Sequence, residues 1–278
     1  DHGINLIHSS YEYGVRWMMS RVLRDHPRRH ALHHVIKVPV PDWDDGGRFE
    51  QAKFVARIEE ALRELCAERI AVVQWMWRAR PNEDPQRLPL LADVLDAVTA
   101  AFARQRDAGK VGWMMPFPYT PAAAAAAVAT GRFDGLVAYY NPIEMEMAPL
   151  LPELERRGMG FLAIRPLLEG VLTDRAADRA ALPAGHRLAD ARFDRAFAQR
   201  AALVEAFADE IDGAMTRFAV RFPLLHPSIA SVIVGLNSEA QVAEIVAYAQ
   251  GAAPRPDLVA RAQALFARGF DRPAAASA

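Results

Sequence analysis

The chain alternates short apolar runs with longer amphipathic segments from one end to the other. The runs that predict β-strands are Ile4–Ile7, Val35–Val40, Ile70–Trp75, Val111–Met115, Leu136–Tyr140, Gly160–Ile164 and Ser231–Val234. These strands are apolar nearly throughout, and helical patterns separate them. The pattern therefore predicts an α/β fold with a parallel sheet that helices cover on both faces.

Apolar residues recur at helical spacing between the strands, most clearly from Phe54 to Leu65 and from Leu88 to Val98. The segment from Pro121 to Ala129 is almost pure alanine and predicts a helix with Thr120 as its N-cap. A polar insertion from Thr173 to Arg200 follows the sixth strand. Two interpretations of it remain open, a lid over the site and a solvated helix with a loop.

The composition is that of a globular protein. The chain has 278 residues, of which 52% are hydrophobic and 24% charged, and we expect one domain over residues 1–278. A net charge of -1 argues against nucleic acid or an anionic membrane as a partner. One cysteine, Cys66, excludes an internal disulfide and a metal site of several thiolates, and we expect no metal.

No apolar run reaches the roughly 18 residues needed to cross a bilayer. No signal peptide is visible either, so we expect a cytoplasmic protein that acts on a small molecule. No pattern in the sequence specifies the oligomeric state.

Chemistry in a parallel α/β fold sits at the carboxyl ends of the strands. Lys37 is the most informative residue there, because an apolar strand is a poor place for an ammonium group that nothing uses. Such a lysine can lower the pKa of a nearby tyrosine hydroxyl, and Tyr13 is a candidate. The alternative is a lysine that reaches solvent. His8 is a candidate base, with a hydrogen-bonded core histidine as the alternative.

Aromatic residues also gather at the strand ends. Trp75, Trp77 and Phe117 predict an apolar pocket wall, although such residues more often pack in a core. Arg165, which follows the sixth strand, is predicted to join the same substrate pocket.

The residues in these positions resemble the aldo-keto reductase superfamily. The segments that carry the resemblance are GINLIHSSYEYG, VIKVPV, ALRELCAERIAVVQWMW, GKVGWMMPFPY, FDGLVAYYNPI, GMGFLAIRPLLEGVLT and AVRFPLLHPSIASVIVGLNSEAQVAEI. They follow the family's order from Gly3 to Ile245, and the ordered set is far more specific than any one motif. The resemblance implies a (β/α)8 TIM barrel of which seven strands are visible, the first strand and helix lying before Asp1.

The resemblance also implies a reaction, the transfer of hydride from NADPH to a carbonyl group. In the family a tyrosine is the general acid, assisted by a lysine, an aspartate and a histidine. Tyr13 matches the tyrosine and Lys37 the lysine, while His8 stands at the aspartate position and Met76 at the histidine position. Two potentially cationic groups would then face each other, which favours a neutral His8.

The turn after the last strand aligns with the family's cofactor-binding positions. The residues expected to contact NADP(H) are Gly235, Leu236, Asn237, Ser238, Gln241 and Glu244. Gln241 stands where the family often has the arginine that grips the 2′-phosphate. Phe117, Pro118 and Val137 replace polar side chains that would hold the nicotinamide.

Two functions are compatible with a site that keeps some of the family's catalytic and cofactor-binding residues and replaces others. The first is a divergent NADP-dependent oxidoreductase that reduces a small aldehyde, ketone or sugar with Tyr13, Lys37 and His8 as catalytic residues. The alternative is a redox-inactive barrel that acts as a binding protein or as a non-redox acid–base enzyme, such as an epimerase or a lyase.

Overall fold

Each apolar run that predicted a strand forms one in this computed structural model, which describes residues 2–183, 185–251 and 253–271. The strands are β1 (Leu6–Ser9), β2 (His33–Pro39), β3 (Ile70–Met76), β4 (Val111–Met114), β5 (Gly135–Tyr139), β6 (Gly160–Ile164) and β7 (Ile229–Ile233). The first strand begins at Leu6 rather than at Ile4, because Leu6 pairs with His33, the first residue of β2.

Helices separate the strands, as the periodicity predicts. The α-helices are α1 (Arg16–Leu23), α2 (Gln51–Glu64), α3 (Asp84–Asp107), α4 (Pro121–Ala129), α5 (Leu151–Arg156), α6 (Asp194–Ala206), α7 (Ala208–Ile211), α8 (Met215–Leu224), α9 (Glu239–Ala249) and α10 (Pro256–Ala267). The Thr120 hydroxyl accepts a hydrogen bond from the Ala123 amide at 3.2 Å, so the predicted N-cap of α4 is confirmed.

Short 3₁₀ helices occur in the connections. They are η1 (Tyr11–Tyr13), η2 (Arg29–Ala31), η3 (Ala148–Leu150), η4 (Leu168–Gly170), η5 (Asp174–Ala176), η6 (Arg179–Ala181), η7 (Arg187–Ala189) and η8 (Ala191–Phe193). The polar insertion after β6 therefore folds as the four turns η5 to η8, followed by α6.

The described residues group into two compact units. The first contains Gly3–Ala138 and Pro152–Gly160, and the second contains Tyr139–Leu151 and the described residues from Phe161 onward. The single domain expected over residues 1–278 stays a prediction.

The first unit is built on a parallel sheet with the strand order β1-β2-β3-β4. In this register His8 lies opposite Val35, and Lys37 lies opposite Gln74. Side chains alternate along a strand, and register partners in neighbouring strands share a face. One face, here named the Lys37 face, therefore carries Leu6, His8, His33, Val35, Lys37, Pro39, Ile70, Val72, Gln74, Met76, Val111 and Trp113.

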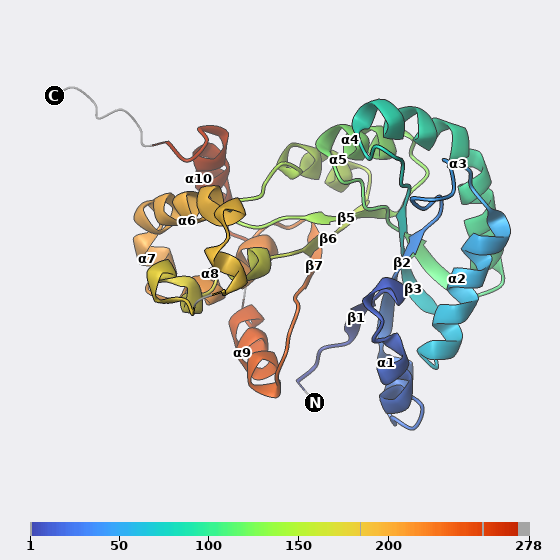
Figure 1. Cartoon of the computed structure of the whole chain (residues 1–278), viewed down its shortest axis with the longest axis horizontal. Coiled ribbons are helices and arrows are strands. Elements are labelled where there is room, and N and C mark those ends of the chain that lie inside the picture. The colour runs from blue at the N-terminus through green and yellow to red at the C-terminus, as the bar shows by residue number, and fades with distance from the viewer. Residues whose placement is uncertain (1, 184, 252, 272–278) are drawn as a thin grey trace. The chain divides into compact units, whose positions relative to one another are not determined.

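The opposite face of this sheet packs into the core of the first unit. Val38 and Trp75 are register partners on this face, and both are fully buried. The Trp75 indole donates to the Val40 carbonyl at 2.7 Å, and the Trp77 indole donates to the carbonyl of Arg87 in α3 at 3.0 Å. Figure 1 shows α2 and α3 together on one side of these strands.

The remaining strands form a sheet with the order β5-β6-β7. Strands β6 and β7 run parallel, with Ile164 opposite Ile233. Within the second unit the Tyr140 ring stacks on Phe222 of α8, with 5.9 Å between the ring centroids. This apolar packing holds α8 beside the strands of the second unit.

Arg78 lies directly after β3 and joins the loops that follow four strands of the first unit. Its Nη1 donates to Glu12 Oε1 at 2.6 Å and to Asp42 Oδ1 at 2.9 Å, and its Nε donates to the Tyr119 hydroxyl at 2.9 Å. Glu12 follows β1, Asp42 follows β2 and Tyr119 follows β4. The Arg78 side chain is only 6% exposed, and its pairing with two carboxylates offsets the cost of burying the charge.

Replacing this guanidinium should therefore destabilise the fold. Arg78→Met leaves two partly buried carboxylates without their cation, and we expect the free energy of unfolding to fall by about 3–5 kcal/mol in urea denaturation. The matched control is Arg80→Met, whose side chain is 66% exposed and pairs with an Asp44 side chain that is 92% exposed. That change should cost less than about 1 kcal/mol, and equal losses for the two variants would contradict the prediction.

Candidate functional site

The three predicted catalytic side chains lie together at one end of the sheet of the first unit. His8 comes from β1, Lys37 from β2 and Tyr13 from the 3₁₀ turn η1. The Lys37 ammonium lies over the Tyr13 ring, 4.7 Å from its centroid, and the His8 and Tyr13 ring centroids are 6.1 Å apart. Tyr13 is 48% exposed, so a ligand can approach it.

Local sequence shapes the turn that presents Tyr13. The Ser10 hydroxyl accepts a hydrogen bond from the Glu12 amide at 3.1 Å and so caps the start of η1. Gly14 ends the turn at a φ of 65°, a left-handed conformation that costs glycine little, and its amide donates to the Tyr11 carbonyl. The two ends of η1 and the Arg78 contact to Glu12 together fix the backbone beside Tyr13.

His8 is neutral at physiological pH. Burial lowers its pKa to about 4, and the charge of Lys37 acts in the same direction, while a hydrogen bond to Gln74 opposes them. The His8 Nε2 and Gln74 Oε1 atoms are 2.7 Å apart. With the amide oxygen as acceptor, Nε2 carries the proton and Nδ1 keeps a lone pair.

Gln74 and Arg78 belong to this site, although sequence reasoning gave neither a role. Gln74 is fully buried on the Lys37 face, and its amide nitrogen has no hydrogen-bond partner among the described residues. Gln74 stands out as the polar residue inside the apolar run from Ile70 to Trp77, and Arg78 directly follows that run. That signal was available, but the partners of these residues depend on the strand register.

The aromatic residues predicted as a pocket wall lie in different places. Trp75 and Trp77 stack on each other with 5.0 Å between centroids, and both are fully buried. Alternation along β3 places Trp75 on the face opposite the Lys37 face, and Trp77 follows the strand and packs against Trp75, so this placement does not support their predicted role in a substrate pocket. Phe117 is buried just after β4, with its ring edge-on to Tyr119. Met76 is buried on the Lys37 face, where it offers no hydrogen-bond donor.

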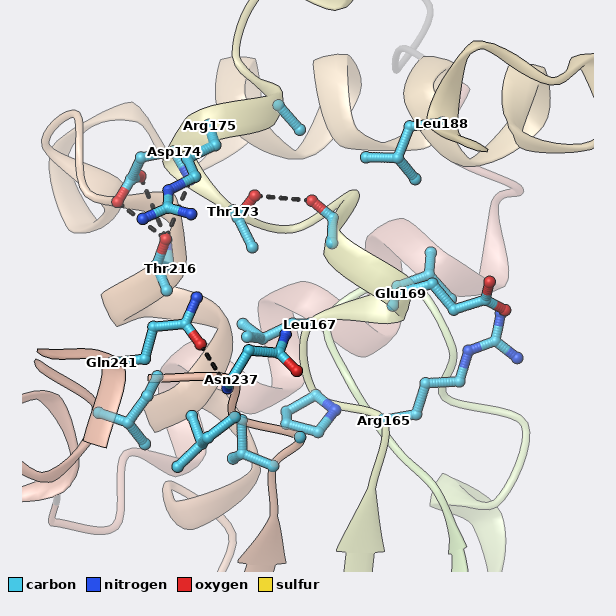
Figure 2. A pocket seen from close by; sticks show the side chains of 18 of the residues that line it. Arg165, Leu167, Glu169, Thr173, Asp174, Arg175, Leu188, Thr216, Asn237 and Gln241 are labelled. Atoms are coloured by element: carbon cyan, nitrogen blue, oxygen red, sulfur yellow. Dashed lines mark hydrogen bonds and ion pairs between the residues drawn. The ribbon is translucent and has the colours of Figure 1, made fainter. Parts of the chain in front are cut away.

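The second unit contains a cavity of about 620 Å³, shown in Figure 2. Of the residues expected to contact a cofactor, it is lined by Gly235, Leu236, Asn237, Gln241 and Glu244. The Gln241 side-chain oxygen accepts a hydrogen bond from the Asn237 amide at 2.8 Å. The sixth expected residue, Ser238, caps the start of α9 by accepting from the Gln241 amide at 3.3 Å.

Arginines and acidic residues both line this cavity, and the acidic ones are Glu169, Asp174 and Glu244. Arg165, Arg175 and Arg187 all line it. Arg175 forms no ion pair among the described residues, and the buried Nε of Arg165 has no hydrogen-bond partner there. The amino-terminal end of α9 adds the partial positive charge of a helix N-terminus. These groups fit an anionic ligand such as a diphosphate.

Acidic side chains hold part of this wall in place. Arg165 pairs with Glu144 at 3.5 Å and with Glu169 at 3.2 Å. Glu169 also pairs with Arg192 at 3.2 Å, and its carbonyl accepts a hydrogen bond from Arg187. The polar insertion is thereby tied to the turn after β6 and supplies part of the cavity wall. Arg165, predicted for the substrate pocket, belongs to this cavity.

In the part of the chain that the structure describes, no group of three or more His, Cys, Asp or Glu side chains is placed to hold a metal ion. None of the described helices combines the length and the apolar character needed to cross a membrane.

Comparison with known proteins gives one family and one fold. The model of the aldo/keto reductase family matches residues 1–255. The aldo-keto reductase AKR11C1 from Bacillus halodurans, solved in apo and holo forms, superposes with a TM-score of 0.69 at 18% identity, covering 95% of this chain and 82% of that one. The glycerol dehydrogenase AKR11B4 from Gluconobacter oxydans gives 0.71 at 19% identity, covering 100% and 85%. No curated protein matches the chain significantly.

At such low identity these solved structures show the fold, which is the (β/α)8 barrel, with seven of its parallel strands in the described residues. The family match extends over most of the chain and includes both the His8–Lys37 cluster and the cavity of the second unit. The chain belongs to the aldo/keto reductase family of oxidoreductases.

Proposed function

We propose that this protein is an NADP(H)-dependent oxidoreductase that reduces the carbonyl group of a small aldehyde, ketone or sugar. The observation that carries the proposal is the cluster of Tyr13, Lys37 and His8 at one end of the β1–β4 sheet. A proton donor, a cation and a neutral imidazole within a few ångströms of each other suit the protonation of a carbonyl oxygen.

Each residue of the cluster has a distinct role in this proposal. The Tyr13 hydroxyl donates the proton to the carbonyl oxygen, and the Lys37 ammonium over its ring stabilises the negative charge left on the phenol. His8 is neutral, so its Nδ1 can take up a proton and return one to Tyr13. Gln74 holds the imidazole through Nε2 and fixes which nitrogen is the acceptor.

The cavity of the second unit is the proposed cofactor site. Arg165, Arg175 and Arg187 and the start of α9 would neutralise the phosphates of NADP(H). When bound, the cofactor supplies the hydride. The holo form of one relative and the name of the other, a glycerol dehydrogenase, are consistent with a nicotinamide cofactor and a small polar substrate.

In this proposal the protein binds the nicotinamide end of the cofactor less tightly than the family's polar side chains would. Phe117, Pro118 and Val137 stand where the family resemblance implies polar side chains, and each lost hydrogen bond is worth about 0.5–1.5 kcal/mol. The alternative function, a binding protein or a non-redox acid–base enzyme, is equally compatible with weak binding of the nicotinamide.

NADPH should quench the tryptophan emission of the protein in a saturable way. Arg175→Met should weaken this binding by about tenfold, because it removes an unpaired cation from the cavity. Arg24→Met, a change of an exposed residue in the first unit, is the charge-matched control and should leave binding unchanged. Absence of saturable quenching up to millimolar cofactor would reject the reductase and leave the alternative function.

Tyr13→Phe should abolish turnover while leaving NADPH binding intact. The substitution removes only the hydroxyl that donates the proton, and general acid catalysis contributes about 10²- to 10⁴-fold. Carbonyl-dependent oxidation of NADPH measures the first effect, and the emission titration measures the second. A variant that keeps full activity would show that Tyr13 is not the acid.

His8 should titrate near pH 4 in the folded protein, instead of near the usual value of about 6.5. Because the unfolded chain binds the proton more readily, the free energy of unfolding should fall as the pH drops from about 6.5 to about 4. NMR titration of the imidazole measures the pKa, and urea denaturation across this range measures the stability. His8→Asn should remove this component of the pH dependence. A His8 midpoint near 6.5 would contradict the neutral relay.

A further inference from the structure

Lys37 is the only residue with a permanent charge on its face of the sheet. The other members of the Lys37 face are apolar side chains, Gln74 and two histidines. Burial keeps His8 neutral at physiological pH, and His33 lies at the other end of β2. The face therefore presents one positive charge on a neutral background.

No carboxylate of the first unit balances this charge. Among the described residues of that unit, Lys37 forms no ion pair and no hydrogen bond, and its close contact is the Tyr13 ring at 4.7 Å. Of the acidic side chains in the loops after β1 and β2, Glu12 and Asp42 are bonded to Arg78, whereas Asp44 pairs with Arg80 and Asp45 with Lys53. Glu12 and Asp42 therefore neutralise Arg78 and do not pair with Lys37.

A half-buried ammonium without a partner attracts an anion more strongly than an exposed one does, because water screens it less. The phenol hydroxyl of Tyr13 adds a neutral hydrogen-bond donor. Since Lys37 Nζ lies over the Tyr13 ring itself, one small molecule can reach both groups. The pair thus suits a ligand with an anionic group next to a neutral oxygen acceptor.

We propose that the substrate is a carbonyl compound with a carboxylate next to its carbonyl group, that is, a 2-oxo acid. The carboxylate pairs with Lys37, and the neighbouring carbonyl oxygen accepts the hydrogen bond from Tyr13. Tyr13 would give its proton to the carbonyl oxygen, and bound NADPH would supply the hydride that the carbonyl carbon takes up, so that the products would be a 2-hydroxy acid and NADP⁺. The reduction rests on the function proposed above, whereas the binding of the anion does not.

Calorimetric titration of the cofactor-free protein with oxalate tests the anion site directly. Oxamide is the neutral isostere of oxalate, and we expect it to bind at least about tenfold more weakly, the usual difference for a charge-assisted hydrogen bond. Lys37→Met should weaken oxalate binding to a similar extent. The matched control is Lys110→Met, which removes the same charge from a lysine that pairs with Glu59, and oxalate affinity should stay unchanged.

The catalytic arm compares glyoxylate with methylglyoxal, which has a neutral acetyl group in place of the carboxylate. With NADPH, kcat/KM for glyoxylate should be at least about tenfold higher. Lys37-dependent oxalate binding without NADPH binding would sink the reductase proposal and keep the anion site.

If the protein binds NADPH and reduces methylglyoxal but binds oxalate no more tightly than oxamide, the reductase proposal stands and the anion site is rejected. If Lys37→Met does not fold, the oxalate and oxamide affinities of the unmodified protein decide the question. Equal affinities overturn the inference.

Discussion

The contacts of Arg78 are the constraint on which the rest of the candidate site depends. This guanidinium is almost fully buried, and the partners that stabilise it come from the loops after β1, β2 and β4. Glu12 is the neighbour of Tyr13 in the chain, so the same ion pair that neutralises Arg78 also places the turn carrying the proposed acid. The two carboxylates are then committed to Arg78, and Lys37 is left without one. Structural stability and the electrostatic character of the site are thus set by one interaction.

Much of the fold could be predicted from the sequence because it is recorded in local patterns. The apolar runs located the seven strands, and Thr120 before an alanine-rich segment located the start of α4. The first strand begins at Leu6 because pairing with His33 decides where a strand can start, and pairing is not a local property. Register also decides the face to which a side chain belongs. Sequence reasoning therefore placed Trp75 and Trp77 in a pocket and overlooked Gln74, their neighbour on the opposite face.

The residues of the candidate site also divide into those that the sequence identifies and those that only the tertiary structure brings into place. Tyr13, Lys37 and His8 could be named in advance because strand ends and the family resemblance both point to them, and the structure brings them together. Arg175 and Arg187 could not be named, because they belong to an insertion that resembles no motif. Contacts such as that of Arg187 with the Glu169 carbonyl bring this insertion to the cavity. Residues placed by tertiary contacts alone leave little trace in a single sequence.

The opposite orientations of the tryptophans in neighbouring strands have a spectroscopic consequence. Trp75 and Trp77 are stacked in the core, where their surroundings change only when the first unit unfolds. Trp113, on the Lys37 face, is 54% exposed and meets solvent directly. Buried indoles emit at shorter wavelengths than hydrated ones, so the blue and red edges of one emission band carry separate information. The buried indole pair therefore reports unfolding of the first unit at the blue edge, whereas Trp113 and the similarly exposed Trp17 contribute to the red edge.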